Sequence, residues 1–504
     1  MRRTILAAAG ALLLAGPTIL AFASGGFFAE PRLIAAIVAW ATVGVAALLA
    51  PQPLPTSRPG RLALAGLVAF TAWSALSIAW APLAGPAFED VQRLVLYVAA
   101  LVAAAALLRP RATARAIEPG LALGVTVVML YGLSERLLPG IIELSRTATG
   151  FGRLDQPLTY WNAEGVLGGI GLVLATRVAG DRDRPAWMRA AAAAVAPALG
   201  LATYISLSRG ALAATAAGLV VVVAAAPTWS QLRAAAVTVG GSAIAAAASA
   251  PLAGFGSLSG SLGTREREGL VMLVLLVALG AVGAGVTLHA RARERTGRAR
   301  GGRLPVPRRA PALAAALVLG AAGLFIAIAA RERGAPRSPS TSAGASRLRS
   351  FDSNRYAYWR VALRSFEHHP LRGVGTAGFR VEWLRERPFH DPAQDAHSLY
   401  LETATELGVV GLALLALFLA GIALSAREAM RRDPTAAAGW LAAATVWAVH
   451  AGVDWDWEMP AVSLIAILLA GAMIARAEAP AAARAGGRAS PAAPPAPAPA
   501  APAG

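Results

Sequence analysis

The 504-residue chain contains no cysteine, and all 46 of its basic residues are arginine. The absence of cysteine excludes disulfides, thiolate metal sites and catalysis by a thiol. Charged residues make up only 15% of the chain, whereas 56% of it is hydrophobic. A soluble domain of this length needs far more charge to cover its surface. The composition therefore excludes an ordinary soluble globular protein.

Other signatures are missing as well. The chain has no glycine-rich phosphate loop of the nucleotide-binding kind, so we infer no nucleotide chemistry. Asp454, Asp456 and Glu458 alternate in a short turn, but they resemble at best a weak site for a divalent ion. No inverted internal repeat of the transporter kind is visible. We expect neither a metal nor another cofactor.

Long apolar runs occupy most of the chain. They span about 18–22 residues, the length that crosses a hydrocarbon core of roughly 30 Å. The first run follows Arg2 and Arg3 and resembles a signal peptide, but the many runs behind it favour an uncleaved helix. The sequence predicts an all-α, polytopic transmembrane helical bundle of 12–14 spans. The expected 14 lie near residues 5–23, 32–50, 62–80, 91–108, 116–137, 158–178, 190–207, 210–226, 233–253, 269–289, 311–330, 398–425, 437–453 and 459–475.

The distribution of arginine predicts the orientation of these spans. If the N-terminus is cytoplasmic, the inside segments hold 26 arginines and the short outside loops hold eight. Cytoplasmic loops carry the excess of positive charge in membrane proteins. Both termini are therefore expected in the cytoplasm of a cell with a cytoplasmic (inner) membrane. The same rule explains the net charge of +18 without nucleic acid as a partner.

Four regions follow from this topology. Residues 1–330 hold the first 11 spans, and residues 331–397 form one large extracytoplasmic loop. Residues 398–476 hold the last three spans. Residues 477–504 are rich in alanine and proline, which predicts a disordered cytoplasmic tail.

The extracytoplasmic loop is the longest predicted segment outside the membrane, so a polar site is expected to involve it. Apolar residues follow helical spacing between residues 355 and 368, with Arg355 and Trp359 on this segment. Arg360 and Arg364 lie one turn apart on another face, which predicts an amphipathic helix in the membrane interface. Pro370 ends the helix, and three glycines between residues 373 and 378 predict an irregular turn.

His397 follows this loop at the start of an apolar helix. Asp395 is the expected N-cap, which would place His397 in the first helical turn. There the helix dipole disfavours protonation of the imidazole, and this suits a neutral base. The alternative is an interfacial histidine without function. Glu402 and Glu406 lie one turn apart near or inside the span, where ionisable groups are functional or are paired with arginines.

Two further clusters carry arginine. Arg209 lies in the segment Ser208-Arg209-Gly210 between two spans, where it could bind a phosphate through bidentate hydrogen bonds or extend to lipid headgroups. Arg153 precedes a span that begins with polar residues, for which capping is the simpler explanation. A last cluster, His450 with the acidic and aromatic residues 454–457, is explained without function by an aromatic belt with acidic caps.

The order of these clusters resembles the bacterial O-antigen ligase and polymerase family. The resemblance covers roughly residues 60–475. It includes Ser208-Arg209-Gly210, Arg355 with Trp359, and Pro370-Leu371-Arg372-Gly373-Val374-Gly375. It also includes His397-Ser398-x-Tyr400-Leu401-Glu402-x₃-Glu406-x-Gly408-x₂-Gly411 and His450-x₃-Asp454. The His…Glu…Gly segment is its most specific part, although the family often has asparagine where this chain has Ser398.

The resemblance implies an inverting, metal-independent transfer of a glycan from undecaprenyl diphosphate to an acceptor on the outer face of the cytoplasmic membrane. His397 would be the general base that deprotonates the acceptor hydroxyl, with Glu402 as the second catalytic candidate. Arg209, Arg355 and, more loosely, Arg153 would hold the donor diphosphate. Arg360, Tyr400 and Glu406 complete the set of expected substrate-binding residues.

Two alternatives stay open. A flippase or transporter of lipid-linked saccharides would line a pathway with Arg209 and Glu402. Within the family, a ligase, a polysaccharide polymerase and a protein O-glycosyltransferase share these motifs. The acceptor is accordingly an unidentified glycan, lipid or protein.

Overall fold

The computed structural model describes residues 1–145, 147, 150–296, 302, 304–305 and 353–479. Apart from the short 3₁₀ turns η1 (Ser24–Gly26) and η3 (Asp456–Glu458), its elements are α-helices. They are α1 (Arg2–Ala21), α2 (Ala29–Leu49), α3 (Arg58–Ser77), α4 (Ala84–Leu107), α5 (Arg111–Leu137), α6 (Trp161–Gly180), α7 (Ala186–Ile205), α8 (Arg209–Ala225), α9 (Trp229–Ser249), α10 (Ala253–Gly256), α11 (Leu262–Arg295), α13 (Arg355–His368), α14 (Phe379–Glu386), α15 (Leu399–Arg432), α16 (Pro434–His450) and α17 (Pro460–Glu478).

These helices confirm the all-α, polytopic fold class. Among the described residues, 11 helices are long and apolar enough to cross a membrane, and α8 is a shorter apolar helix. Every expected span that lies in the described residues coincides with one of the helices α1–α9, α11 or α15–α17. The span expected at residues 311–330 and the first part of the extracytoplasmic loop, residues 331–352, lie outside the described residues, as does the tail from residue 480. The count of 14 spans remains a prediction.

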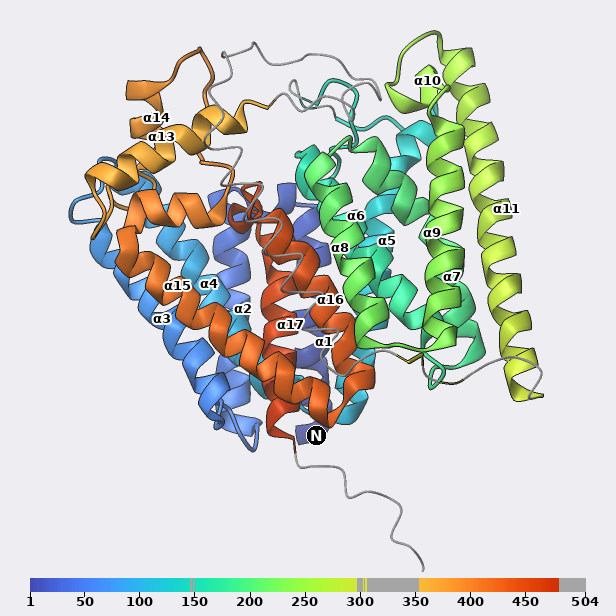
Figure 1. Ribbon diagram of the computed structural model, residues 1–504, viewed down its shortest axis with the longest axis horizontal. Helices are drawn as coiled ribbons and strands as arrows, with labels where there is room; N and C mark the ends of the chain where they lie inside the picture. The colour runs from blue at the N-terminus through green and yellow to red at the C-terminus, as the bar shows by residue number, and fades with distance from the viewer. Residues whose placement is uncertain (146, 148–149, 297–301, 303, 306–352, 480–504) are drawn as a thin grey trace, which may run out of the picture.

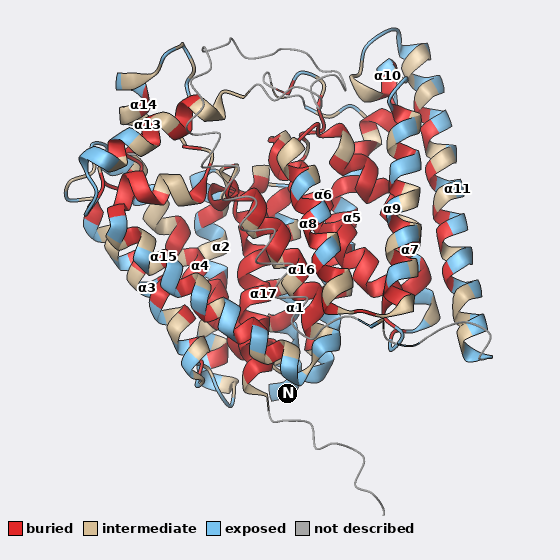
Figure 2. Ribbon diagram, in the orientation of Figure 1, coloured by how far each residue is buried: buried red, intermediate tan, exposed pale blue. Residues whose placement is uncertain are grey.

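The long helices pack side by side, and α6 and α17 form the centre of the bundle (Figures 1 and 2). The most apolar stretches of both helices are buried along their whole length, whereas those of α1, α2, α9 and α11 are buried over little more than a quarter. Large apolar side chains such as Leu270, Val274 and Val277 cover the open face of α11. Such faces suit lipid, which is as apolar as the side chains themselves.

Small residues allow the closest helix contacts. A Cβ on Gly66 of α3 would lie 2.5 Å from the backbone nitrogen of Phe418, and one on Gly421 of α15 would lie 2.3 Å from that of Ala63. Glycines let two helix backbones approach closely in membrane proteins, where dispersion contacts replace the hydrophobic effect. Helix α15 is thereby fixed on α3, and this contact places its N-terminal half beside the loop segments that carry His397.

The bundle has two distinct ends. We call the end that carries α13 and α14 the loop end, and the end that carries Arg2 and Glu478 the terminus end (Figure 1). At the terminus end, Glu478 accepts hydrogen bonds from Ser57 and Arg109, at 2.8 Å and 2.6 Å, and Arg2 donates to the carbonyl of Leu49. The two ends of the described chain therefore meet on one side of the bundle, as the predicted topology requires.

The predicted amphipathic helix is present as α13, with the expected bounds of residues 355 and 368. Ser353 Oγ accepts a hydrogen bond of 3.3 Å from the backbone amide of Arg355, as expected of a cap residue. The glycine turn is also present, since Gly373 and Gly375 have φ of 67° and 93°. The short helix α14 that follows was not predicted.

Candidate functional site

The turn between α16 and α17 lies at the centre of the loop end. Its three carboxylates, those of Asp454, Asp456 and Glu458, are buried. Asp454 pairs with Arg355 of α13, Asp456 with His450 of α16, and Glu458 with Arg93 of α4 at 2.9 Å. Three partners on three helices show that these residues do more than form the belt of acidic caps inferred from the sequence. The turn joins elements that lie far apart in the chain.

Asp454 is the most heavily bonded of these carboxylates. Besides Arg355, it accepts hydrogen bonds from the hydroxyl of Tyr160, at 2.6 Å, and from the backbone amide of Trp455, at 2.9 Å. Burial alone would raise the pKa of Asp454, but Arg355, the two nearby histidines and the hydrogen bond from Tyr160 together outweigh it, and the pKa lies below its usual value. Asp454 is therefore ionised, and it holds the guanidinium of Arg355 in one place.

Asp454 thus positions Arg355 without shielding its side chain completely from the surroundings. Its side chain is 20% exposed, whereas that of Asp454 is fully buried. A guanidinium has five N–H donors in a fixed fork, so a contact with one carboxylate oxygen leaves donors for another anion. The geometry is compatible with the predicted role of Arg355 in binding a phosphate.

His397 lies in the loop just before α15, not inside the helix. The helix begins at Leu399, and its N-cap is Ser398, whose side chain accepts a hydrogen bond from the amide of Leu401 at 3.4 Å. The expected N-cap at Asp395 is therefore wrong. His397 has a φ of 53°, a left-handed conformation that is uncommon outside glycine. Because His397 lies outside the helix, the dipole of a first turn does not account for its properties.

The contacts of the His397 ring define its tautomer. Nδ1 lies 3.0 Å from the backbone carbonyl oxygen of Asp395, which can only accept a hydrogen bond. Nδ1 must therefore carry the proton, and in the neutral ring Nε2 has its lone pair available. Burial lowers the pKa of His397, and the charge of Arg355 adds to this effect against the opposing charge of Asp454. A neutral imidazole with an available nitrogen is what a general base requires.

Aromatic rings surround the same imidazole. The ring centroid of Tyr358 lies 5.0 Å from that of His397, and that of Trp455 lies 6.5 Å away. The indole of Trp359 donates to the carbonyl of His397 at 3.4 Å. Helix α13 and the turn before α17 therefore hold His397 from two sides, and the residue lies next to the Arg355–Asp454 pair.

Glu402 supports the His397 loop from within α15. Its carboxylate accepts a hydrogen bond of 2.7 Å from the backbone amide of Ala396, the residue before His397. The sequence suggested a catalytic carboxylate or a partner for an arginine, whereas the observed contact is with the backbone. This contact ties the segment that carries His397 to α15.

Glu406 and Gly408 shape the other side of the same half-helix. Glu406 accepts from the amide of Phe379 at 3.1 Å and so caps α14. Gly408 has φ 64° and ψ −163°, a conformation open essentially only to glycine, and it breaks α15 into two parts. The amides of Val374 and Gly375 donate to the carbonyls of Thr405 and Glu406, at 3.0 Å and 2.8 Å. The break satisfies its backbone groups through the predicted glycine turn.

Arg153 approaches this site from the loop between α5 and α6. Its guanidinium lies 3.6 Å from the ring centroid of Trp161, and its Nε donates to the carbonyl of Gly150 at 2.9 Å. Trp161 packs against Tyr160, the residue that bonds Asp454. Arg153 is also one wall of a cavity of about 220 Å³, together with Arg136 and Asp155. It thus belongs to the same connected set of side chains as Arg355.

Arg209 is the first residue of α8, and its neighbours contact the turn region. Ser208 is the N-cap, and its Oγ lies 3.5 Å from Nε2 of His450. A Cβ on Gly210 would lie 3.2 Å from the same imidazole nitrogen. The structure therefore places the Ser-Arg-Gly segment beside His450, which itself pairs with Asp456.

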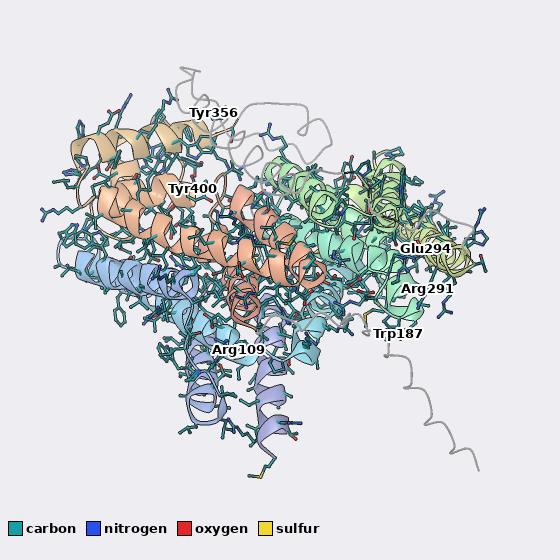
Figure 3. The ribbon with its side chains drawn as sticks, turned by 60° about the horizontal axis from the view of Figure 1, so that its bottom comes forward. Arg109, Trp187, Arg291, Glu294, Tyr356 and Tyr400 are labelled. Carbon is teal, nitrogen blue, oxygen red and sulfur yellow. The ribbon has the colours of Figure 1, made fainter. Side chains whose placement is uncertain are left out.

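The remaining predicted residues bond mainly to backbone. Arg360 donates from Nε to the carbonyl of Tyr356 at 3.3 Å, within α13. Tyr400 donates its hydroxyl to the carbonyl of Ala448 at 2.9 Å and so ties α15 to α16. Figure 3 shows Tyr356 and Tyr400 on α13 and α15, which pack against each other. Their roles in substrate binding remain predictions.

Asp454 stands in one of the sequence motifs, but neither Asp454 nor Asp456, Tyr160 and Trp161 was predicted as a site residue. The sequence did indicate that some acidic residue is buried, because Arg93 lies within an apolar span and a buried arginine needs an anionic partner. Which acidic turn would provide that partner depends on helix neighbours, and spacing along the chain does not contain that information.

Comparison with known proteins finds a family that is similar to part of the chain. No curated protein matches the chain. The family model described as O-Antigen ligase matches residues 192–416, which hold Arg209, Arg355, His397 and Glu402, while Arg153 and Asp454 lie outside the match. The resemblance inferred from the sequence motifs is confirmed over this segment, so residues 192–416 of this polytopic membrane protein are similar to O-antigen ligases.

Proposed function

We propose that this protein transfers a glycan from undecaprenyl diphosphate to an acceptor hydroxyl at the loop end, and that the loop end faces the outside of the cytoplasmic membrane. The observation that carries the proposal is the environment of His397. Its Nδ1 is bonded to a backbone carbonyl, its Nε2 is available, and the Arg355–Asp454 pair lies beside it. A base and a fixed cation in one place are what glycosyl transfer from a diphosphate requires.

The chemistry follows from these two groups. Nε2 of His397 takes the proton of the acceptor hydroxyl as its oxygen attacks C1 of the donor sugar. The bond from C1 to the diphosphate breaks, and the departing oxygens gain negative charge. Arg355 and Arg209 stabilise this charge. One displacement inverts the configuration at C1, and no metal is required for this balance of charge.

Product mass distinguishes this transfer from transport. Purified protein is reconstituted in proteoliposomes with an undecaprenyl-diphosphate glycan and cell-envelope acceptors, and the products are analysed by mass spectrometry. Transfer gives an acceptor heavier by the glycan and free undecaprenyl diphosphate. A flippase or transporter would move the donor between leaflets with its mass unchanged, and that result would contradict the proposal. The mass of the acceptor also separates a ligase from a polymerase or a protein O-glycosyltransferase.

The orientation has its own test, because the chain has no cysteine of its own. Ser259→Cys introduces an exposed thiol at the loop end, and Thr56→Cys introduces one at the terminus end. An impermeant thiol reagent applied to spheroplasts should label the first variant and leave the second unlabelled until the cells are lysed. The reverse pattern would overturn the proposed orientation.

A further inference from the structure

A buried chain of hydrogen bonds at the loop end has no part in the transfer step. Asp456 and His450 are both fully buried, and Ser208 is 2% exposed. Nδ1 of His450 is bonded to Oδ2 of Asp456, and Nε2 lies 3.5 Å from Oγ of Ser208. We refer to these three residues as the relay. They come from the loop before α8, the end of α16 and the turn before α17.

The direction of each hydrogen bond in the relay follows from its end groups. The carboxylate of Asp456 accepts, so Nδ1 of His450 is the donor and Nε2 is an acceptor in the neutral ring. Ser208 Oγ accepts from the backbone amide of Ala211 at 3.2 Å, and its hydroxyl proton is free to point at Nε2. Each hydrogen bond of the relay then has one donor and one acceptor, and the relay ties α8 to α16 and α17.

Serine, histidine and aspartate in this order resemble a nucleophile with its base. The contacts contradict that function here, because a nucleophilic hydroxyl must reach a substrate. Ser208 Oγ is almost fully buried, and it caps α8. The relay therefore has a positioning role, and the residue that it positions is Arg209, which follows Ser208 in the chain.

That residue is Arg209, which is flanked on both sides by contacts with His450. Ser208 makes the hydrogen bond, and Gly210 leaves room for the ring, since a Cβ there would lie 3.2 Å from Nε2 and Cδ2 and 3.1 Å from Val453. Such a close contact requires the neighbour to give way, and a buried ring has little freedom to do so. Both neighbours of Arg209 are thus fitted to the same imidazole.

We propose that Asp456, His450 and Ser208 are positioning residues that set the guanidinium of Arg209 for the diphosphate of the lipid-linked donor. This inference rests on the proposed function. The same turn that anchors the relay through Asp456 also holds Arg355 through Asp454. One rigid segment therefore fixes two cations that come from α8 and α13, so that both are in place before the donor arrives. Preorganised charge of this kind costs no rearrangement when the diphosphate leaves.

A double-mutant cycle on the full-length protein in nanodiscs tests the relay, with undecaprenyl diphosphate as the probe and its Kd as the readout. Loss of one hydrogen bond that orients a charged group should weaken binding about 10-fold. We expect this for Ser208→Ala and for Asp456→Asn. Ser208→Thr keeps the hydroxyl and the helix cap, and it should bind within about 2-fold of wild type.

The decisive measurement is the same substitution in a chain that lacks the arginine. If the relay acts through Arg209, Ser208→Ala should have no further effect in the Arg209→Ala background, because residues that act as a unit are not additive. Thr228→Ala is the matched control. Thr228 caps α9 at the terminus end, where its hydroxyl oxygen accepts a 3.1 Å hydrogen bond from the backbone amide of Gln231, and loss of this bond should leave the Kd unchanged.

Each other outcome contradicts the inference in a recognisable way. If the effects of Ser208→Ala and Arg209→Ala add in full, the relay is a structural feature alone. If Arg209→Ala weakens binding but Asp456→Asn and Ser208→Ala do not, the inference fails and the proposed function stands. If Arg209→Ala itself binds as wild type, the donor role of Arg209 fails together with the relay. Thermal unfolding of each variant shows whether the fold is retained, and Asp456→Asn replaces Ser208→Ala in the cycle if the latter does not fold.

Discussion

The loop end and the terminus end of the bundle both contain buried arginines paired with carboxylates. At the terminus end, Glu118 of α5 lies 3.0 Å from Arg184, and Arg177 lies 3.5 Å from Asp181. Glu294 of α11 lies 3.9 Å from Arg189. At the loop end, the pairs involve Asp454 and Glu458. Buried ion pairs alone therefore do not identify a reactive centre, in keeping with their frequent structural role.

Backbone conformation distinguishes the two ends. In the described part of the chain, the non-glycine residues with positive φ are Ser24, Phe151, Thr159, Leu207, Leu258, Ala377 and His397. All of them lie in segments that join helices at the loop end, between α1 and α2, α5 and α6, α7 and α8, α10 and α11, or α13 and α15. Each such residue costs of order 1–3 kcal/mol, and these conformations concentrate where geometry serves function. The terminus end is relaxed, and the loop end is constrained.

Buried ion pairs therefore stabilise the bundle at both ends, whereas strained backbone conformations mark the end whose geometry serves function. If this distinction holds, substitutions at the loop end should change turnover more than stability. Substitutions at the terminus end should do the reverse.

The largest effect is expected for His397. Loss of a positioned base typically lowers the rate by about 10²–10⁴-fold, so His397→Ala should bind undecaprenyl diphosphate and leave the glycan donor untransferred. His368→Ala, His369→Ala and His390→Ala are matched controls, because these three histidines are exposed on the same side of the bundle. Transfer by His397→Ala at the wild-type rate would remove the base from the account, and Glu402 would be the next candidate.

The rate should also depend on pH through the same ring. Because burial lowers the pKa of His397, the neutral base persists below the usual range of histidine. The rate should then fall as the pH drops through this lowered pKa, and His397→Ala should lose that dependence. Burial raises the pKa of the nearby Asp395 to about 6, so Asp395→Asn shows which group the profile reports. A profile that follows Asp395 would contradict the assignment to His397.

Arg355 is expected to follow in size. Removing a desolvated cation from a phosphate contact should weaken the use of the donor, measured as kcat/KM, by roughly 2–5 kcal/mol. Arg355→Lys should restore only part of this loss, because lysine lacks the planar fork of the guanidinium. Arg355→Ala also leaves Asp454 buried without its cation. The double variant Arg355→Ala/Asp454→Asn removes that second effect, since asparagine carries no charge. If Arg355 only neutralises Asp454, the double variant should recover donor use. If Arg355 binds the diphosphate, the double variant should stay as impaired as Arg355→Ala.

Glu402 should show a smaller and more specific effect. Glutamine keeps an oxygen that can accept from the amide of Ala396, whereas alanine removes it. Loss of this hydrogen bond should cost about 1–3 kcal/mol, so Glu402→Ala should slow transfer about 10-fold and Glu402→Gln should stay near wild type. Steady-state rates at saturating donor separate these cases. Equal loss in both variants would mean that the carboxylate itself carries a proton in the reaction.

At the terminus end, Glu118→Gln should leave the kinetics unchanged. It removes the charge that Arg184 contacts, and breaking a buried pair costs about 3–5 kcal/mol of stability. The expected result is a lower unfolding temperature with an unaltered KM and kcat in the folded fraction. A change in KM as large as that of Arg355→Ala would show that the two ends are coupled, and the comparison would fail.

Much of the fold follows from the sequence, because hydrophobic length and amphipathic spacing are local properties. The spans in the described residues fall on helices, and α13 has the expected bounds since Ser353 and Pro370 mark its limits. The break at Gly408 was not predicted. It depends on amides of Val374 and Gly375 that come from another segment.

In the candidate site, too, the local motifs could be predicted and the contacts between distant segments could not. His397, Arg209 and Arg355 were identified as separate motifs, but the turn that connects them was taken for an aromatic belt with acidic caps. The partners of Asp454 and Asp456 lie on α13 and α16, and only the packing of helices shows which of them meet. The N-cap of α15 was misplaced by three residues because Asp395, Ser398 and other polar residues can each cap a helix.

Photocrosslinking tests most directly whether the loop end holds the reactive centre. A farnesyl diphosphate analogue with a photoreactive group is bound to the full-length protein in nanodiscs and irradiated. The crosslinked peptides are then identified by mass spectrometry. The account predicts adducts on peptides that contain Arg209, Arg355 or His397, and their loss when undecaprenyl diphosphate is added as a competitor. Adducts that map instead to terminus-end peptides with Arg177 or Arg184, and that the same competitor removes, would contradict it.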